Sequence, residues 1–160
     1  MPHRVGIGYD AHRFEAGRPL ILGGIEVPHT MGLAGHSDAD VLTHAICDAL
    51  LGAAGLPDIG MLFPPGDPAT KGISSLKILA EAVRRVMAQW FNILNIDAVI
   101  VAQAPPLAPH LSAMKKTLDS VLHIGADAIG IKATTTEGMG FAGRGEGIAV
   151  QAVALLEMGK

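Results

Sequence analysis

Cysteine and aromatic residues are scarce in this chain of 160 residues, which has one cysteine, Cys47, and only 4% Phe, Trp and Tyr. A single cysteine cannot form an internal disulfide, which favours a reducing compartment. Because Cys47 lies in an apolar helical pattern, we expect it to be a small buried hydrophobe. With so few aromatic rings, the core must be built from aliphatic side chains and close backbone contacts.

Charge and long apolar runs are also limited. Charged residues make up 17% of the chain and the formal net charge is −3, which argues against a nucleic-acid partner. No apolar run approaches the roughly 18 residues of a membrane span, and residues 1–5 lack the basic-then-apolar layout of a signal peptide. We therefore expect no membrane partner, and a location in a bacterial cytoplasm or, for a plant or alga, in the plastid stroma.

Apolar residues, by contrast, make up 49% of the chain, a content that excludes disorder. The length is that of one domain, so residues 1–160 are expected to form a single unit. Hydrophobic periodicity predicts the elements along the chain. Strands are expected at residues 4–13, 96–103, 129–135 and 148–158, a hairpin at 20–27, and helices at 38–54 (capped by Ser37), from Ser74 or Ser75 to residue 91 with Trp90 inward, and at 110–123.

This order of elements predicts an α/β (α+β) sandwich of ferredoxin-like type, with a mixed sheet and helices on one face. The uncovered face of the sheet would need a partner, which suggests self-association. Residues 55–72 form the longest irregular stretch and contain four prolines. Loops of this length are usually functional or disordered. Asp58 and Asp67 in this stretch could grip a substrate hydroxyl or, more commonly, form turns.

A short strand motif offers the first candidate metal ligands. Asp10 and His12 lie two residues apart, so a strand would project both side chains to the same side. His44, on a helical stripe with Asp40 and Asp48, could be a third ligand. One carboxylate, two imidazoles and an open fourth position describe a catalytic zinc site. Asp40 or Asp48 could then orient His44, although a surface pair and a solvated helix face explain the same residues.

Two further segments contain residues that could bind phosphate or a metal ion. His36 lies in a loop just before a predicted helix N-terminus, a place that favours phosphate. Threonines 134–136 close a strand and are followed by Glu137, a ligand type for hard cations, and by Arg144, which could bind phosphate or carboxylate. Gly138, Gly140 and Gly143 match a dinucleotide-binding pattern, but too little chain follows them for the helix, strand and acidic residue that such a site needs.

Together these segments resemble the 2-C-methyl-D-erythritol 2,4-cyclodiphosphate synthase family, in its stand-alone form, over essentially the whole chain. The resemblance rests on four separate motifs in order: Gly8-Tyr9-Asp10-Ala11-His12; Leu33-Ala34-Gly35-His36-Ser37-Asp38-Ala39-Asp40 with His44; Asp58-Ile59-Gly60 with Leu62-Phe63-Pro64; and Lys132-Ala133-Thr134-Thr135-Thr136-Glu137 with Gly140-Phe141-Ala142-Gly143-Arg144-Gly145-Glu146-Gly147.

The resemblance implies an enzyme of the non-mevalonate route to isoprenoid precursors. Such an enzyme, a phosphorus–oxygen lyase, converts 4-diphosphocytidyl-2-C-methyl-D-erythritol 2-phosphate to 2-C-methyl-D-erythritol 2,4-cyclodiphosphate and CMP. The 2-phosphate attacks the β phosphorus of the same molecule, with metal ions balancing charge. The resemblance also implies a homotrimer whose sheet faces pack around the axis, with active sites between subunits.

The resemblance further assigns roles to residues. Asp10, His12 and His44 would bind zinc, Glu137 would hold magnesium or manganese on the diphosphate, and His36 and Thr135 would steady the transition state. Contacts with the cytidine diphosphate substrate are expected from Asp10, His12, His36, Ser37, Asp58, Ile59, Gly60, Phe63, Asp67, Ala102, Ala104, Pro105, Pro106, Leu107, Ala108, Thr134, Thr135, Thr136, Glu137, Phe141 and Arg144. Phe141 and Arg144 would lie near an axial cavity that could take an isoprenoid diphosphate.

Two positions depart from the family pattern. Pro65 stands where an acidic residue is common, and Pro106 stands where a lysine is common, so the loop and cytidine contacts are open to change. Two other functions use the same residues. One is a metal-dependent phosphoesterase with water as nucleophile, and the other is a non-catalytic trimeric binder of isoprenoid diphosphates.

Overall fold

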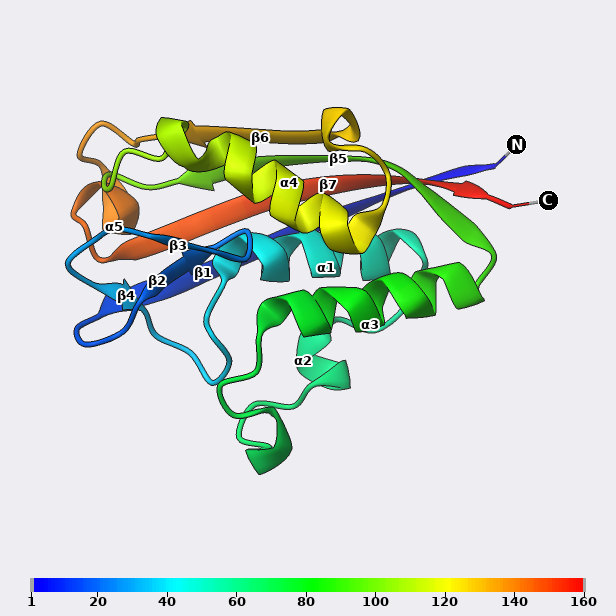
Figure 1. Cartoon of the computed structure of the whole chain (residues 1–160), viewed down its shortest axis with the longest axis horizontal. Coiled ribbons are helices and arrows are strands. Elements are labelled where there is room, and N and C mark those ends of the chain that lie inside the picture. The colour runs from blue at the N-terminus through cyan, green and yellow to red at the C-terminus, as the bar shows by residue number, and fades with distance from the viewer. Residues whose placement is uncertain (1, 160) are drawn as a thin grey trace.

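A five-stranded sheet is the central element of the computed structural model, which describes residues 2–159 (Figure 1). Its strand order is β4-β1-β7-β5-β6, and only β5 and β6 run parallel. The strands are β1 (His3–Glu15), β4 (Gly32–Leu33), β5 (Phe91–Val101), β6 (Ile129–Thr134) and β7 (Gly147–Met158). A separate hairpin of β2 (Leu20–Leu22) and β3 (Ile25–Val27) confirms the hairpin predicted for residues 20–27.

Three longer helices, α1 (Val41–Ala53), α3 (Ser75–Ala88) and α4 (Leu111–Leu122), accompany the sheet. Helix α1 packs on β1 and β7, α4 packs on β6, and α3 packs on α1 and α4. Two single-turn helices, α2 (Ile59–Leu62) and α5 (Gly140–Gly143), and three 3₁₀ turns at Pro68–Thr70, Ala108–His110 and Ala126–Ala128 complete the fold. The mixed sheet with helices confirms the predicted fold class. Among the described residues, no helix combines the length and apolar character needed to cross a membrane.

Strand β1 shows why the helices lie on one face only. Gly6 and Gly8 are buried beneath α1, whereas Val5, Ile7 and Tyr9 between and beside them are more than 60% exposed. Because successive side chains point to opposite faces of a sheet, the exposed residues share the face without helices. This face is apolar and uncovered in the single chain, as the sequence predicted.

Glycine at positions 6 and 8 lets α1 approach the strand closely. A Cβ atom on Gly8 would lie 1.9 Å from the backbone oxygen of Ala45, and one on Gly6 would lie 2.0 Å from that of Ala49. No side chain larger than hydrogen fits at such distances, because interiors are close-packed. The two glycines therefore set the separation of α1 from β1, and with it the distance between the functional residues that the two elements carry.

The first helix begins later than the sequence suggested. It starts at Val41 rather than Asp38, and its N-cap is Asp40 rather than Ser37, because the Asp40 carboxylate accepts the N–H of Thr43 at 3.0 Å. Ala39, immediately before the cap, has a left-handed backbone with φ of 58°. That conformation breaks the helical path and turns the two flanking aspartates toward different parts of the molecule.

The second helix is capped by Ser74, one of the two serines predicted for this role, but it ends at Ala88 rather than residue 91. Trp90, expected to point inward, is 75% exposed and has a left-handed φ of 62°. The chain reverses at this residue and β5 begins at Phe91, five residues earlier than expected. A helical extrapolation of the apolar pattern failed here because the turn rotates Trp90 away from the core.

Candidate active site

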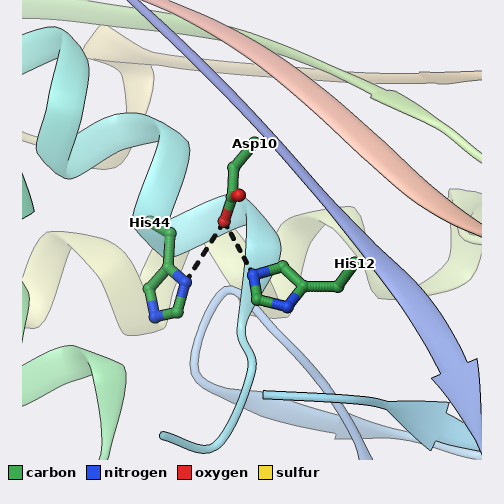
Figure 2. Close-up of side chains that lie close together, drawn as sticks. All are labelled: Asp10, His12 and His44. Atoms are coloured by element: carbon green, nitrogen blue, oxygen red, sulfur yellow. Dashed lines mark hydrogen bonds and ion pairs between the residues drawn. The ribbon is translucent and has the colours of Figure 1, made fainter. Parts of the chain in front are cut away.

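Asp10, His12 and His44 converge at one point between β1 and α1 (Figure 2). One oxygen of Asp10, Oδ2, lies 2.8 Å from Nε2 of His12 and 3.2 Å from Nδ1 of His44. The three potential ligand atoms lie within 4.8 Å of one another. A carboxylate and two imidazoles are the donor set of a divalent metal site with room for a further ligand. The predicted convergence of these three residues is confirmed, and the group could hold a divalent metal.

The electrostatics of the triad follow from its partial burial and its opposite charges. Burial alone would raise the pKa of Asp10, but hydrogen bonds to His12 and His44 and their positive charge outweigh it and lower the pKa to about 2. Burial would likewise lower the pKa of His12, but the hydrogen bond and the charge of Asp10, together with the Ala34 carbonyl, raise it above 6.5. Asp10 is thus a carboxylate ready to bind a cation at neutral pH.

Each imidazole has a polar partner behind it. Nδ1 of His12 lies 2.6 Å from the carbonyl oxygen of Ala34, and Nε2 of His44 lies 2.8 Å from Oγ of Ser75 and 3.2 Å from Oγ of Ser37. Such partners fix the ring orientation of metal-binding histidines. Sequence reasoning missed Ser75, whose only signal was its place at a predicted helix start.

The two aspartates expected to orient His44, Asp40 and Asp48, instead accept hydrogen bonds from backbone N–H groups. Asp40 is fully buried, and its two oxygens accept the N–H groups of Gly23 and Gly24 at 2.9 and 2.7 Å as well as bonds from Thr43. It ties the β2–β3 hairpin to the start of α1. Asp48 accepts the N–H of Ile59 at 3.0 Å and so anchors the segment that follows α1. The prediction that either residue hydrogen-bonds His44 was wrong.

A pocket of about 370 Å³ opens beside the triad. Its lining brings together residues from β1, α1, α2, α3 and the loops between them. Of the predicted contact residues, it includes Asp10, His12, His36, Ser37, Asp58, Ile59, Gly60 and Phe63; it also includes the predicted metal ligand His44 and adds Asp48, Pro65, Thr70, Ile73 and Ile78. The structure therefore places the Asp10, His12 and His44 group and the predicted substrate contacts of residues 58–63 around a single opening.

The loops around this pocket are held by local hydrogen bonds. Asp58 caps α2 by accepting the N–H of Met61 at 2.9 Å, and Asp67 caps the next 3₁₀ turn, so both aspartates have the turn-forming role that the sequence left open. Asp67 is not in the pocket lining, but its carbonyl oxygen lies 2.7 Å from Nε2 of His36. Arg18, which sequence reasoning missed, donates to the carbonyls of Gly35 and Ser37 at 2.6 and 2.8 Å.

A second group of predicted residues lies at the carboxyl ends of the parallel strands β5 and β6. The N–H of Ala102 donates to the carbonyl of Thr134 at 3.0 Å, and the side-chain oxygen of Gln103 accepts the N–H of Gly138 at 3.2 Å. Glu137, which lies between Thr134 and Gly138 in the sequence, has a left-handed φ of 52°. Within the single chain this group is not part of the pocket lining. The predicted roles of residues 102–108 and 134–137 therefore stay predictions.

Phe141 lies at a second, more open hollow. It lines this hollow with residues of β1 and with Met31, and His12 borders both the hollow and the triad pocket. Arg144, just after α5, pairs with Glu146 at 3.1 Å and is largely exposed. The turn around α5 leads directly into β7, so the glycine pattern at residues 138–143 has no dinucleotide-binding context.

Comparison with known proteins gives a consistent result. The family model described as the YgbB family matches residues 3–157. The 2-C-methyl-D-erythritol 2,4-cyclodiphosphate synthase of Desulforamulus reducens is 55% identical over 98% of this chain and 99% of its own length. Among solved structures, bifunctional IspDF from Campylobacter jejuni has a TM-score of 0.95 and 43% identity, over 98% of this chain and 42% of that longer one.

A second solved structure covers a chain of similar length. It is a 2C-methyl-D-erythritol-2,4-cyclodiphosphate synthase in its CDP-bound form, with a TM-score of 0.88 and 40% identity over 96% of this chain and 100% of the other. Sequence, fold and the Asp10, His12 and His44 group all agree with this relationship. The chain belongs to the YgbB family, the family of the 2-C-methyl-D-erythritol 2,4-cyclodiphosphate synthases.

Proposed function

We propose that this chain catalyses the reaction for which its relatives are named. It converts 4-diphosphocytidyl-2-C-methyl-D-erythritol 2-phosphate to 2-C-methyl-D-erythritol 2,4-cyclodiphosphate and CMP, as a phosphorus–oxygen lyase of the non-mevalonate route. The observation that carries this proposal is the joining of the Asp10, His12 and His44 group to one pocket that also contains Asp58 and Gly60. The 55% identity to a synthase over nearly the full chain supports it.

Electrostatic repulsion is the main contribution to the barrier of this reaction, because an anionic 2-phosphate oxygen must approach an anionic diphosphate. Phosphoryl transfer of this kind depends on positioning and electrostatics rather than on a covalent protein nucleophile. Zinc held by Asp10, His12 and His44, and magnesium or manganese held by Glu137, would neutralise the phosphates and align them for ring closure. The donor set fits this assignment, since two imidazoles and a carboxylate suit zinc and a lone carboxylate suits a harder cation.

The pocket residues would hold the substrate in the folded shape that cyclisation requires. Asp58 and Gly60 lie where the methylerythritol hydroxyls could be gripped, and Ile59 and Phe63 supply apolar walls that limit access of water. His36 and Ser37 line the pocket from the loop that Arg18 holds by its hydrogen bonds, where they can contact a phosphate. Asp67 contributes by fixing the ring of His36 through its carbonyl oxygen.

The cytidine end is proposed to bind between subunits of a homotrimer. The apolar face of β1 is uncovered in the single chain, and the residues assigned to cytidine lie at the ends of β5 and β6, outside the triad pocket. A neighbouring copy would bring its own Thr135, Thr136 and Glu137 beside the pocket, together with Ala102, Ala104, Pro105, Pro106, Leu107 and Ala108. The hollow at Phe141 would then face the trimer axis, where an isoprenoid diphosphate could bind. A reducing cytoplasm suits the single, buried Cys47.

The product distinguishes this function from its alternatives. Purified protein is mixed with the cytidylated substrate, zinc and magnesium, and the products are identified by phosphorus NMR. Cyclic diphosphate together with CMP is expected. A hydrolysed, linear phosphate would indicate a phosphoesterase with water as nucleophile, and binding without release of CMP would indicate a non-catalytic binder; either result would reject the proposal.

A further inference from the structure

A chain of polar side chains extends behind His44, on the side of the ring that faces away from Asp10. Oγ of Ser75, the first residue of α3, lies 2.8 Å from Nε2 of His44. The same hydroxyl donates to Oδ1 of Asp38, and the N–H of Ser75 donates to Oδ2 of Asp38 at 3.0 Å. Ser75 is fully buried, so water does not compete for these bonds. The chain Asp38–Ser75–His44 joins residues that are 37 and 31 positions apart in the sequence.

The number of protons fixes the direction of these bonds. A serine hydroxyl has one proton and a carboxylate can only accept, so the Ser75 proton points to Asp38. Oγ of Ser75 must therefore accept from His44, which places an imidazole proton on Nε2. The other ring nitrogen, Nδ1, lies 3.2 Å from the Asp10 carboxylate and is left as the nitrogen that can bind a metal.

His12 shows the same arrangement with a different acceptor. Its Nδ1 faces the carbonyl oxygen of Ala34 at 2.6 Å, which can only accept, so Nε2 is left facing Asp10. Both rings thus have a fixed acceptor behind them and face the Asp10 carboxylate with the other nitrogen. The acceptor behind His12 is backbone and cannot be changed by substitution, whereas the acceptor behind His44 is a serine that can be removed.

We infer that Ser75, held by Asp38, is a positioning residue that sets the tautomer and the ring orientation of His44 and so makes Nδ1 its metal-binding atom. This inference rests on the proposed metal role of Asp10, His12 and His44. Asp38 is suited to the task because both of its oxygens are engaged by Ser75, and Oδ1 also accepts the N–H of Asp40 at 3.2 Å. The left-handed turn at Ala39 directs the two aspartates to different partners. Asp38 binds Ser75 behind His44, whereas Asp40 binds the backbone of the β2–β3 hairpin.

Zinc affinity of Ser75→Ala tests the inference, with Ser74→Ala as the matched control. Ser74 is the adjacent serine, caps α3 through the N–H of Leu76, and makes no bond to His44. Competition of the full-length protein with a chromophoric chelator is expected to show zinc binding about 10–100-fold weaker for Ser75→Ala. Ser74→Ala should match the wild type, and Ser75→Thr, which keeps the hydroxyl, should restore most of the affinity.

The Nε2 proton of His44 gives a second readout that needs neither metal nor activity. In metal-free wild-type protein with ¹⁵N-labelled histidine, Nε2 of His44 is expected to carry a proton that exchanges slowly with solvent, and in Ser75→Ala this proton should exchange faster. An unprotonated Nε2 in the wild type would overturn the inference even if Ser75→Ala failed to fold. Equal zinc affinity of Ser75→Ala and wild type would overturn it as well. A wild type whose zinc binding does not depend on His44 would instead reject the proposed metal site.

Discussion

Few ligands hold the candidate metal, so each one matters. Loss of a residue that only orients a ligand typically weakens metal binding about 10–100-fold, so loss of a direct ligand should exceed about 100-fold. We predict that His44→Ala weakens zinc binding and lowers turnover by at least this factor, so that the purified variant has lost most of its zinc. Elemental analysis of the purified variant measures the first. His3→Ala, which removes an exposed histidine near Glu157, is the control and should keep its zinc; full zinc occupancy in His44→Ala would contradict the assignment.

Proton competition should make metal binding dependent on pH. The pKa of His12 is raised by the Asp10 carboxylate despite burial, so this imidazole stays protonated to a higher pH than an ordinary histidine. Below that raised pKa a metal must displace the proton, and the apparent affinity should fall about tenfold per pH unit; above it, no proton is displaced from His12 and this dependence ends. Chelator competition between about pH 5.5 and 8 measures the profile, and a flat profile would exclude protonation of His12.

Glu137 is predicted to serve the second cation. We expect Glu137→Gln to keep its zinc, because the residue lies outside the triad pocket, but to lose the dependence of its rate on magnesium, because an amide is a poor ligand for a hard cation. Rates measured across a magnesium titration test this. An unchanged magnesium response in the variant would count against the assigned role.

The sequence could predict residues that belong to one repeating pattern. Asp10 and His12 share a face by strand alternation, so their proximity followed from spacing alone. Ser75 could not be predicted from its spacing because it is 31 residues from His44, and its only local signal was a helix start. Asp40 and Asp48 were assigned to His44 because they share its helical stripe, yet backbone N–H groups from other segments of the chain, those of Gly23 and Ile59, occupy their oxygens.

At the scale of elements, the contact of β1 with α1 is the one on which the site depends. Gly8 is predicted to tolerate no side chain, because an added Cβ would lie 1.9 Å from the oxygen of Ala45. We expect Gly8→Ala to destabilise the protein by about 3 kcal/mol or more, since overpacking forces the backbone to shift. Urea denaturation measures this loss.

A glycine of the partner element provides the control for that variant. Gly52 lies in α1, and the nearest atom to a Cβ placed on it is 3.9 Å away. Gly52→Ala should therefore stabilise the protein by about 1 kcal/mol, the usual gain of alanine over glycine within a helix. Equal effects of the two substitutions would show that the close approach of strand and helix is not what Gly8 provides.

The types and order of the longer elements followed from hydrophobic periodicity, including the final strand β7, but several ends and the short elements β4, α2 and α5 did not. Ala39 and Trp90 adopt left-handed conformations that no apolar pattern reveals, and these two residues set the start of α1 and the turn into β5. Tertiary contacts stabilise such conformations against their local preference. The errors in predicted boundaries are therefore concentrated where distant parts of the chain meet.

At the scale of the whole molecule, the uncovered side of the sheet predicts a specific assembly. We expect the wild type to sediment as a trimer and Ile7→Glu to sediment as a monomer, because burying a charge in an apolar contact is unfavourable. Ile7 is 62% exposed in the single chain, so the variant should still fold. Met87→Glu is the control, since Met87 has a similar exposure of 60% but lies on α3, away from this face. A trimeric Ile7→Glu would place the contact elsewhere.

The strict alternation along β1 has a genetic consequence. Even-numbered positions from Gly6 to His12 pack against α1 or carry the candidate metal ligands, and odd-numbered positions from Val5 to Tyr9 form the outer surface. Inserting one codon within this stretch would exchange the two sets for every residue on one side of the insertion. Catalysis and assembly would then be lost together, although no amino acid had been replaced, whereas inserting two codons would preserve the parity of the strand.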